Sequence, residues 1–201
     1  DLTITPHVYT GVLPAVEAKY RQLNSFGAFQ LGGFLTYGTI ENVNSDVPSN
    51  RKGMRGYFDG NGKVQPDPVW SITTSVRVAS DKTVARRYDI SYDDRLRSFV
   101  NAERISPNSY ISIAGWAFQG LRQDDQQKQI PFALPAIDAR WLTGEIAGGR
   151  VEVEANSLSI FRIEGQDTQR AFASARWDLR RLTPWGQEVL LTAYGRGDIY
   201  H

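Results

Sequence analysis

The chain has 201 residues, with 23 Lys and Arg against 22 Asp and Glu and 41% hydrophobic residues. The net charge of +1 argues against a nucleic-acid partner held by a strong basic field, and the hydrophobic content argues against an acidic disordered chain. There is no cysteine, and the two histidines, His7 and His201, stand at opposite ends of the sequence. A cysteine nucleophile, a thiolate zinc site, a histidine-rich metal site or a Ser-His-Asp triad therefore has little or nothing to build on, and we expect no catalytic residues, no metal site and no cofactor.

Apolar and polar residues alternate along most of the chain, and no stretch sustains a helical period or an apolar run of about 18 residues. Clusters of Gly, Pro, Asn and Asp separate the alternating segments. In chain order, strands are expected at residues 2–9, 12–23, 28–40, 54–64, 69–79, 96–105, 110–121, 136–143, 150–161, 170–182 and 187–201. The pattern predicts an all-β chain, an antiparallel up-and-down meander of about eleven strands.

The segment 69–79 is the clearest of these strands, because its two faces differ sharply. Its apolar face carries Trp70, Ile72, Val76 and Val78, and its polar face carries Ser71, Thr73, Ser75 and Arg77. Such alternation is typical of a sheet with one face in an apolar environment and the other in water.

The connections between the expected strands are of two kinds. Short turns contain Pro66, Pro107 and Pro184, whereas long connections cover residues 41–52, 80–95, 122–135 and 165–169. Short turns at one end and long loops at the other are typical of outer-membrane barrels, and soluble sandwiches usually have strands of about 5–6 residues. The sequence therefore favours an outer-membrane β-barrel, with a soluble β-sandwich as the alternative.

If the chain is a barrel wall, its polar faces line the lumen. The charged residues on these faces have both signs, which suits the polar, water-filled interior of such a barrel. The residues expected to face the lumen are Arg77, Glu152, Glu154, Arg170, Arg176, Arg180, Arg196 and Asp198. Glu152 and Glu154 are interpreted as part of this solvated face, not as the carboxylate pair of a glycosidase.

Two prolines interrupt the first expected strands. Pro6 lies within the alternation of Leu2, Ile4 and Val8, and Pro14 is expected early in the next strand. Proline cannot donate a ladder hydrogen bond, so it is confined to edges, strand starts and bulges. Either a weak seam between strands or a simple bulge at a rim explains Pro6.

Two groups of motifs, one near each end of the chain, resemble a known family. The first comprises Asp-Leu-Thr-Ile-Thr-Pro at 1–6, Gly11, Tyr-Arg-Gln-Leu at 20–23 and Gly27. The second comprises Gln-Arg-Ala-Phe at 169–172, Arg176-Trp177 and Tyr-Gly-Arg-Gly-Asp-Ile-Tyr at 194–200; Val69-Trp70 and Ser80-Asp81 also fit. Together these motifs resemble LptD, the lipopolysaccharide-assembly family also called organic solvent tolerance proteins, and most closely an alphaproteobacterial member.

The resemblance implies that residues 1–201 are the N-terminal segment of a barrel of about 26 strands, without the periplasmic jelly-roll domain and the closing strands. It implies a non-enzymatic transport protein of the outer membrane that inserts lipopolysaccharide into the outer leaflet. An LptE-like lipoprotein would plug the lumen, and an LptA-like periplasmic bridge would deliver lipopolysaccharide through the jelly roll. The first strand would pair with the last at a lateral gate, which makes Pro6 and Pro14 gate candidates.

Two other functions remain open on the sequence. A general porin or receptor barrel would share the strand pattern but lack the opening motif. A soluble carbohydrate-binding or hydrolytic β-domain would bury one face of each strand against a second sheet.

Overall fold

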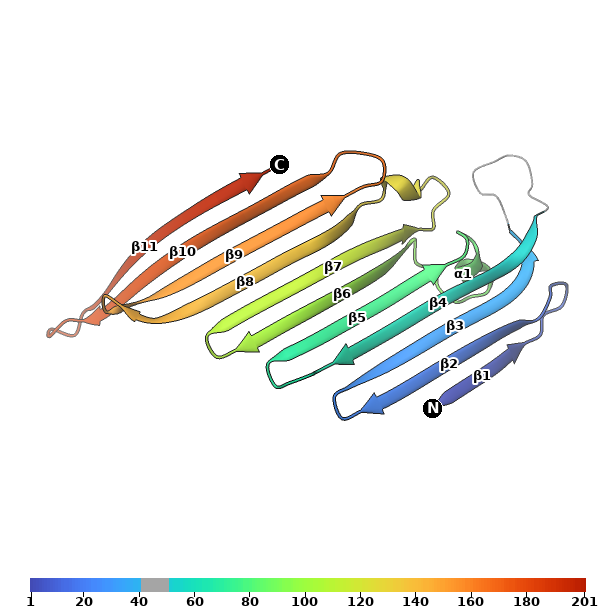
Figure 1. Cartoon of the computed structure of the whole chain (residues 1–201), viewed down its shortest axis with the longest axis horizontal. Coiled ribbons are helices and arrows are strands. Elements are labelled where there is room, and N and C mark those ends of the chain that lie inside the picture. Colours follow the sequence, from blue (N-terminus) through green and yellow to red (C-terminus); the bar gives the residue numbers. More distant parts are fainter. Residues whose placement is uncertain (41–50) are drawn as a thin grey trace.

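The computed structural model describes residues 1–40 and 51–201, which form one antiparallel sheet of eleven strands in sequence order (Figure 1). The strands are β1 (Leu2–His7), β2 (Ala15–Asn24), β3 (Gly27–Thr39), β4 (Lys52–Val64), β5 (Trp70–Ala79), β6 (Arg95–Ser106), β7 (Ser109–Gly120), β8 (Phe132–Ile146), β9 (Gly149–Phe161), β10 (Thr168–Leu182) and β11 (Glu188–Tyr200). The predicted all-β meander is confirmed.

Two strand starts, those of β2 and β8, differ from the prediction by three residues or more. Strand β2 begins at Ala15, opposite His7, so Pro14 precedes the strand instead of lying within it. The carbonyl of Pro14 accepts a hydrogen bond from the Thr36 hydroxyl, 3.3 Å away, outside the ladder. Strand β8 begins at Phe132, earlier than expected, because a register shift between Ala133 and Ala136 accommodates the residues in between.

The connections lie as predicted, short at one end of the sheet and long at the other (Figure 1). The long end carries α1 (Val84–Arg87) between β5 and β6 and the 3-10 turn η1 (Gln127–Gln129) between β7 and β8. Most of the long connection predicted at 41–52 lies outside the described residues.

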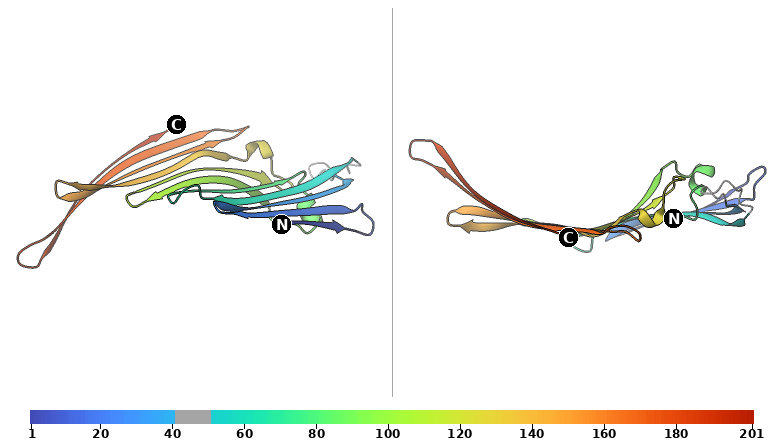
Figure 2. Two further views of the ribbon diagram at one scale, coloured as in Figure 1. Left: turned by 60° about the horizontal axis from the view of Figure 1, so that its bottom comes forward. Right: turned by 90° about the horizontal axis from the view of Figure 1, so that it is seen from above.

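The sheet is a single, strongly curved layer, with β1 and β11 as its two edges (Figure 2). Within residues 1–40 and 51–201 there is no second sheet to cover either face, as a β-sandwich would require. No helix in this part of the chain is long and apolar enough to cross a bilayer.

The main buried cluster of the described chain lies where the β5–β6 connection, residues 80–94, folds against the sheet. It consists of Ala15, Phe34, Tyr57, Ala79, Val84, Ala85, Leu96 and Leu121, with Tyr9, Tyr88 and Ile90 packed around it. The remainder of the sheet has no such cover, and many large apolar side chains stay exposed.

Candidate functional site

The strand register links the side-chain alternation of all eleven strands into two continuous faces. Successive residues of a strand point to opposite faces, and directly paired residues share a face. For example, Asp59 is paired with Arg77 and Thr73 with Asn101, which places these residues on one face. The same chain of pairs continues across the sheet to Arg140, which is opposite Glu154.

One face, called here the apolar face, is hydrophobic over most of its area. Its exposed large residues include Leu2, Ile4, Val16, Leu31, Leu35, Met54, Phe58, Ile72, Val76, Val78, Val100, Ile113, Trp141, Val189, Leu191 and Ile199. The charged residues of the described strands that fall on this face, Lys52, Arg104 and Arg181, lie at or near strand ends. Contiguous exposed apolar surface of this extent marks an interaction with a membrane or with another protein.

The opposite face, called here the polar face, carries every residue that the sequence assigned to the lumen. Glu152 is opposite Arg176, Glu154 is opposite Ser174, and Ser174 is in turn opposite Arg196. Two-residue steps along the strands then add the remaining positions. The register thus brings together Arg77, Glu152, Glu154, Arg170, Arg176, Arg180, Arg196 and Asp198 on one side of the sheet.

Ion pairs connect opposite charges over β8–β11 on the polar face. Arg140 lies 3.0 Å from Glu154, and Arg176 lies 2.8 Å from Asp178. Arg196 binds both carboxylate oxygens of Asp198, at 2.9 and 2.6 Å. The charges therefore compensate one another locally, and the face is hydrophilic without a strong field of one sign.

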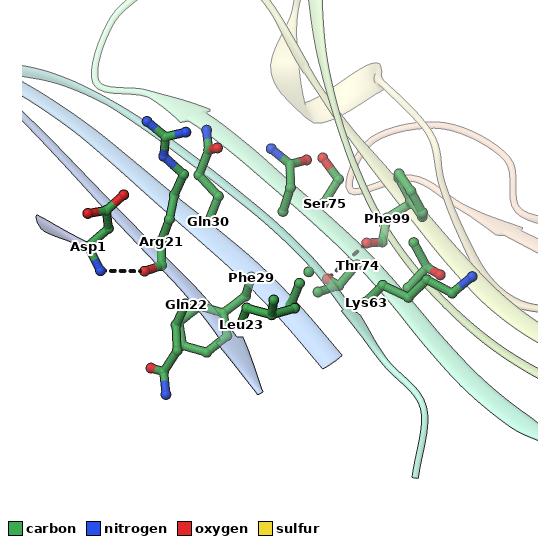
Figure 3. A pocket seen from close by; sticks show the side chains of 14 residues that line it. Asp1, Arg21, Gln22, Leu23, Phe29, Gln30, Lys63, Thr74, Ser75 and Phe99 are labelled. Atoms are coloured by element: carbon green, nitrogen blue, oxygen red, sulfur yellow. Dashed lines mark hydrogen bonds between the residues drawn. The ribbon is translucent and has the colours of Figure 1, made fainter. Parts of the chain in front are cut away.

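The polar face is hollowed by a groove of about 770 Å³ near the short-turn end of β2–β6 (Figure 3). Arg21, Gln30 and Ser75 point to one side in this view, and Gln22 points to the other, as the register requires. A second groove of about 820 Å³ contains Glu152, Arg176 and Arg180. The first groove offers charged and amide groups to a hydrated partner, and the second offers charged groups of both signs.

The β5–β6 connection is tied to the polar face by a buried ion pair. Arg55 Nε and Nη2 donate to the two carboxylate oxygens of Asp81 at 2.9 and 2.7 Å, and the side chains are 1% and 10% exposed. The Asp81 carboxylate also accepts hydrogen bonds from the backbone N–H groups of Thr83 and Val84, both 3.0 Å long. Burial raises the pKa of Asp81, but these hydrogen bonds outweigh burial and hold the pKa below its ordinary value.

A second ion pair fixes the far end of the same connection. Arg77 lies 2.7 Å from Asp93, and it also donates to the Tyr57 hydroxyl at 2.9 Å. The hydrogen bond from Arg77 holds the pKa of the Asp93 carboxyl below its ordinary value. Sequence reasoning treated this connection as a plain loop, although its spacing of Val84, Ala85 and Tyr88 was a signal of local packing.

Strand β1 is a weakly held edge strand. The backbone N–H that it lacks, at Pro6, would point away from β2. Asp1 and Arg21 exchange both backbone hydrogen bonds, each 2.9 Å long, so odd residues of β1 bond to β2. Pairs alternate between bonded and non-bonded in an antiparallel ladder, and Pro6, opposite Val16, is therefore a non-bonded pair. The nitrogen of Pro6 points away from β2, toward the free edge.

Comparison with known proteins shows the family to which this two-faced sheet belongs. A family model described as LptD, LPS transport system D, matches residues 53–201. The chain belongs to the LptD family. No curated protein matches it. Membership in the LptD family connects the two-faced sheet with lipopolysaccharide transport and disfavours both the general porin and the soluble carbohydrate-binding domain.

Proposed function

We propose that this LptD-family chain forms part of the barrel wall of an outer-membrane translocon that inserts lipopolysaccharide into the outer leaflet. The observation that carries the proposal is the division of eleven strands into one apolar and one polar face. The apolar face contacts lipid, and the polar face contacts an aqueous lumen. Family membership supplies the cargo, lipopolysaccharide.

The proposal extends to one partner inside the barrel and one on its periplasmic side. A lipoprotein of the LptE type sits against the mixed charges of the polar face. An LptA-type bridge delivers lipopolysaccharide from the periplasm through a jelly-roll domain of the full-length protein. The ion pairs of the polar face support this arrangement. Their opposite charges cancel locally, so the face offers hydrogen-bonding groups to a partner without a strong field that would attract ions of one sign.

The assignment of faces is tested by photo-crosslinking in the full-length protein. Crosslinkers at Arg176 and Glu154 should capture a plug lipoprotein, because both positions lie on the polar face. Crosslinkers at the neighbouring positions Ala175 and Val153, which are directly paired on the apolar face, serve as the matched control and should capture lipid. Lipid captured at Arg176 and Glu154 would show that the faces are reversed.

The route by which lipopolysaccharide leaves the lumen is proposed to run past β1. In the closed barrel the edge of β1 pairs with the last strand, and the nitrogen of Pro6 points to that partner. One missing ladder bond removes about 0.5–1.5 kcal/mol of net pairing, so this seam opens more readily than its neighbours. Pro14 precedes β2 and lies outside the β1–β2 ladder, so the proposed seam rests on Pro6.

Replacing Pro6 should therefore slow transport. The full-length Pro6→Val variant gains a donor toward the closing strand, and we expect slower appearance of pulse-labelled lipopolysaccharide at the cell surface without loss of barrel stability. Pro14→Val, the same chemical change outside the ladder, is the control and should transport at the normal rate. Normal transport by Pro6→Val, with its new N–H protected from exchange, would reduce Pro6 to an ordinary edge residue.

A further inference from the structure

Strand β1 has few backbone contacts, because it is short and lies at an edge of the sheet. It has six residues paired with β2, against thirteen pairs between β10 and β11, and its side chains before His7 are exposed. Short edge strands of this kind fray easily, because a single ladder holds them. Additional contacts that hold β1 must therefore come from outside its own ladder.

The β5–β6 connection supplies such contacts at the long-connection end of β1. The ring of Tyr88 lies 5.6 Å from Tyr9, which follows β1, and 5.0 Å from Phe34 of β3. Tyr9 in turn stacks on His7, the last residue of β1, at 6.1 Å and an interplanar angle of 8°. Offset and tilted aromatic pairs at these separations attract one another beyond their buried area.

The position of Tyr88 is itself fixed by the buried ion pair described above. Arg55, fully buried, binds Asp81 at the start of the connection and places its guanidinium 5.8 Å from the centre of the Tyr88 ring. The turn of α1 holds Tyr88 from the other side, since its N–H donates to the Val84 carbonyl at 3.3 Å. Tyr88 is thus anchored to β4, while its ring contacts Tyr9, just after β1, which lies three strands away from β4.

We propose that the β5–β6 connection is an internal brace that holds β1 in place through Tyr88. This inference rests on the proposed function only for the purpose of the brace. In the proposed translocon, β1 is the movable side of the exit seam. The brace lies on the polar face, so it resists inward and sideways displacement of β1 without blocking the free edge that the closing strand needs. Separation of β1 from the sheet then requires that the Tyr9–Tyr88 contact break.

Hydrogen exchange of the full-length protein in lipid nanodiscs tests the brace without any measurement of transport. In the Tyr88→Ala variant, the amides of Thr3, Thr5 and His7 should exchange about 2- to 10-fold faster than in the wild type, the range expected for loss of aromatic pair contacts. Tyr88→Phe keeps the ring contacts and should exchange like the wild type. Tyr92→Ala is the matched control, because this exposed tyrosine of the same connection hydrogen-bonds Asp89 instead of contacting β1.

The outcomes separate the brace from general destabilisation and from the proposed transport role. Faster exchange confined to β1, with β6 and β7 unchanged, supports the brace. Equal acceleration in β1, β6 and β7, or unchanged exchange in β1, would overturn it. If exchange contradicts the brace but Pro6→Val transports slowly, the proposed function still stands. If exchange supports the brace but Pro6→Val transports at the normal rate, the brace stands without the proposed role of the seam.

Discussion

The substitution Val76→Arg is expected to destabilise the full-length protein in a bilayer by about 2–4 kcal/mol where the site is near the midplane. Val76 is 38% exposed on the apolar face, in the middle of β5, and its pairing partner there is Gly60. The cost arises because a guanidinium at this position must remain in hydrocarbon or distort the bilayer to reach water. Urea unfolding of the protein in lipid vesicles measures the change in the free energy of unfolding.

The neighbouring residue provides the control for this experiment. Ser75 points to the polar face and is paired with Asn61, so Ser75→Arg places the same charge in water and should cost far less. Single cysteines at the two positions give an independent check in detergent-free membranes, where a soluble thiol reagent should label position 75 and spare position 76. Equal labelling of both would contradict the assignment of the apolar face to lipid.

Removal of Arg55 is expected to cost about 3–5 kcal/mol, because it leaves the Asp81 carboxylate buried without its partner. Arg55→Ala also removes the hydrogen bond that the guanidinium donates to the Thr39 carbonyl of β3, 3.1 Å long. Heat-denaturation midpoints of the full-length protein in detergent measure the loss. The double variant Arg55→Met with Asp81→Leu should recover part of it, since two apolar groups need no partner.

Lys128→Ala is the matched control for Arg55→Ala at the same end of the sheet. Lys128 pairs with Glu164 at 2.7 Å, but both side chains are largely exposed, and such pairs contribute about 0–1 kcal/mol. A loss in Arg55→Ala no greater than that in Lys128→Ala would show that the buried pair does not hold the connection in place.

Acid should remove the contribution of Asp81 and thereby report on the same pair. The folded-state pKa of Asp81 lies below its ordinary value of 3.8, so the stabilisation is complete above that value and is lost as the pH falls through the lower folded value. The difference in stability between the wild type and Asp81→Asn should therefore shrink between neutral pH and about pH 3. A constant difference over this range would contradict the pairing of Asp81 with Arg55.

The alternation of residues by itself determined the sheet, its strand count and the composition of its two faces. Segments such as 69–79 and 170–182 alternate so regularly that their faces follow from counting in steps of two, and the register only joined them into one surface. This succeeds because the period of a strand is local and does not depend on which strand lies beside it. The family motifs added the cargo, which no periodicity can indicate.

Tertiary structure alone decided three features that no local pattern contains. The direction of the Pro6 nitrogen depends on the phase of the β1–β2 ladder, and a shift of one residue would turn it toward β2. The partner of Arg55 lies 26 residues further along the chain, so the alternation within β4 does not show that Arg55 is buried. The contact between Tyr9 and Tyr88 likewise exists only because a loop folds back over the sheet, and such long-range contacts depend on the whole chain's path, not on neighbouring residues.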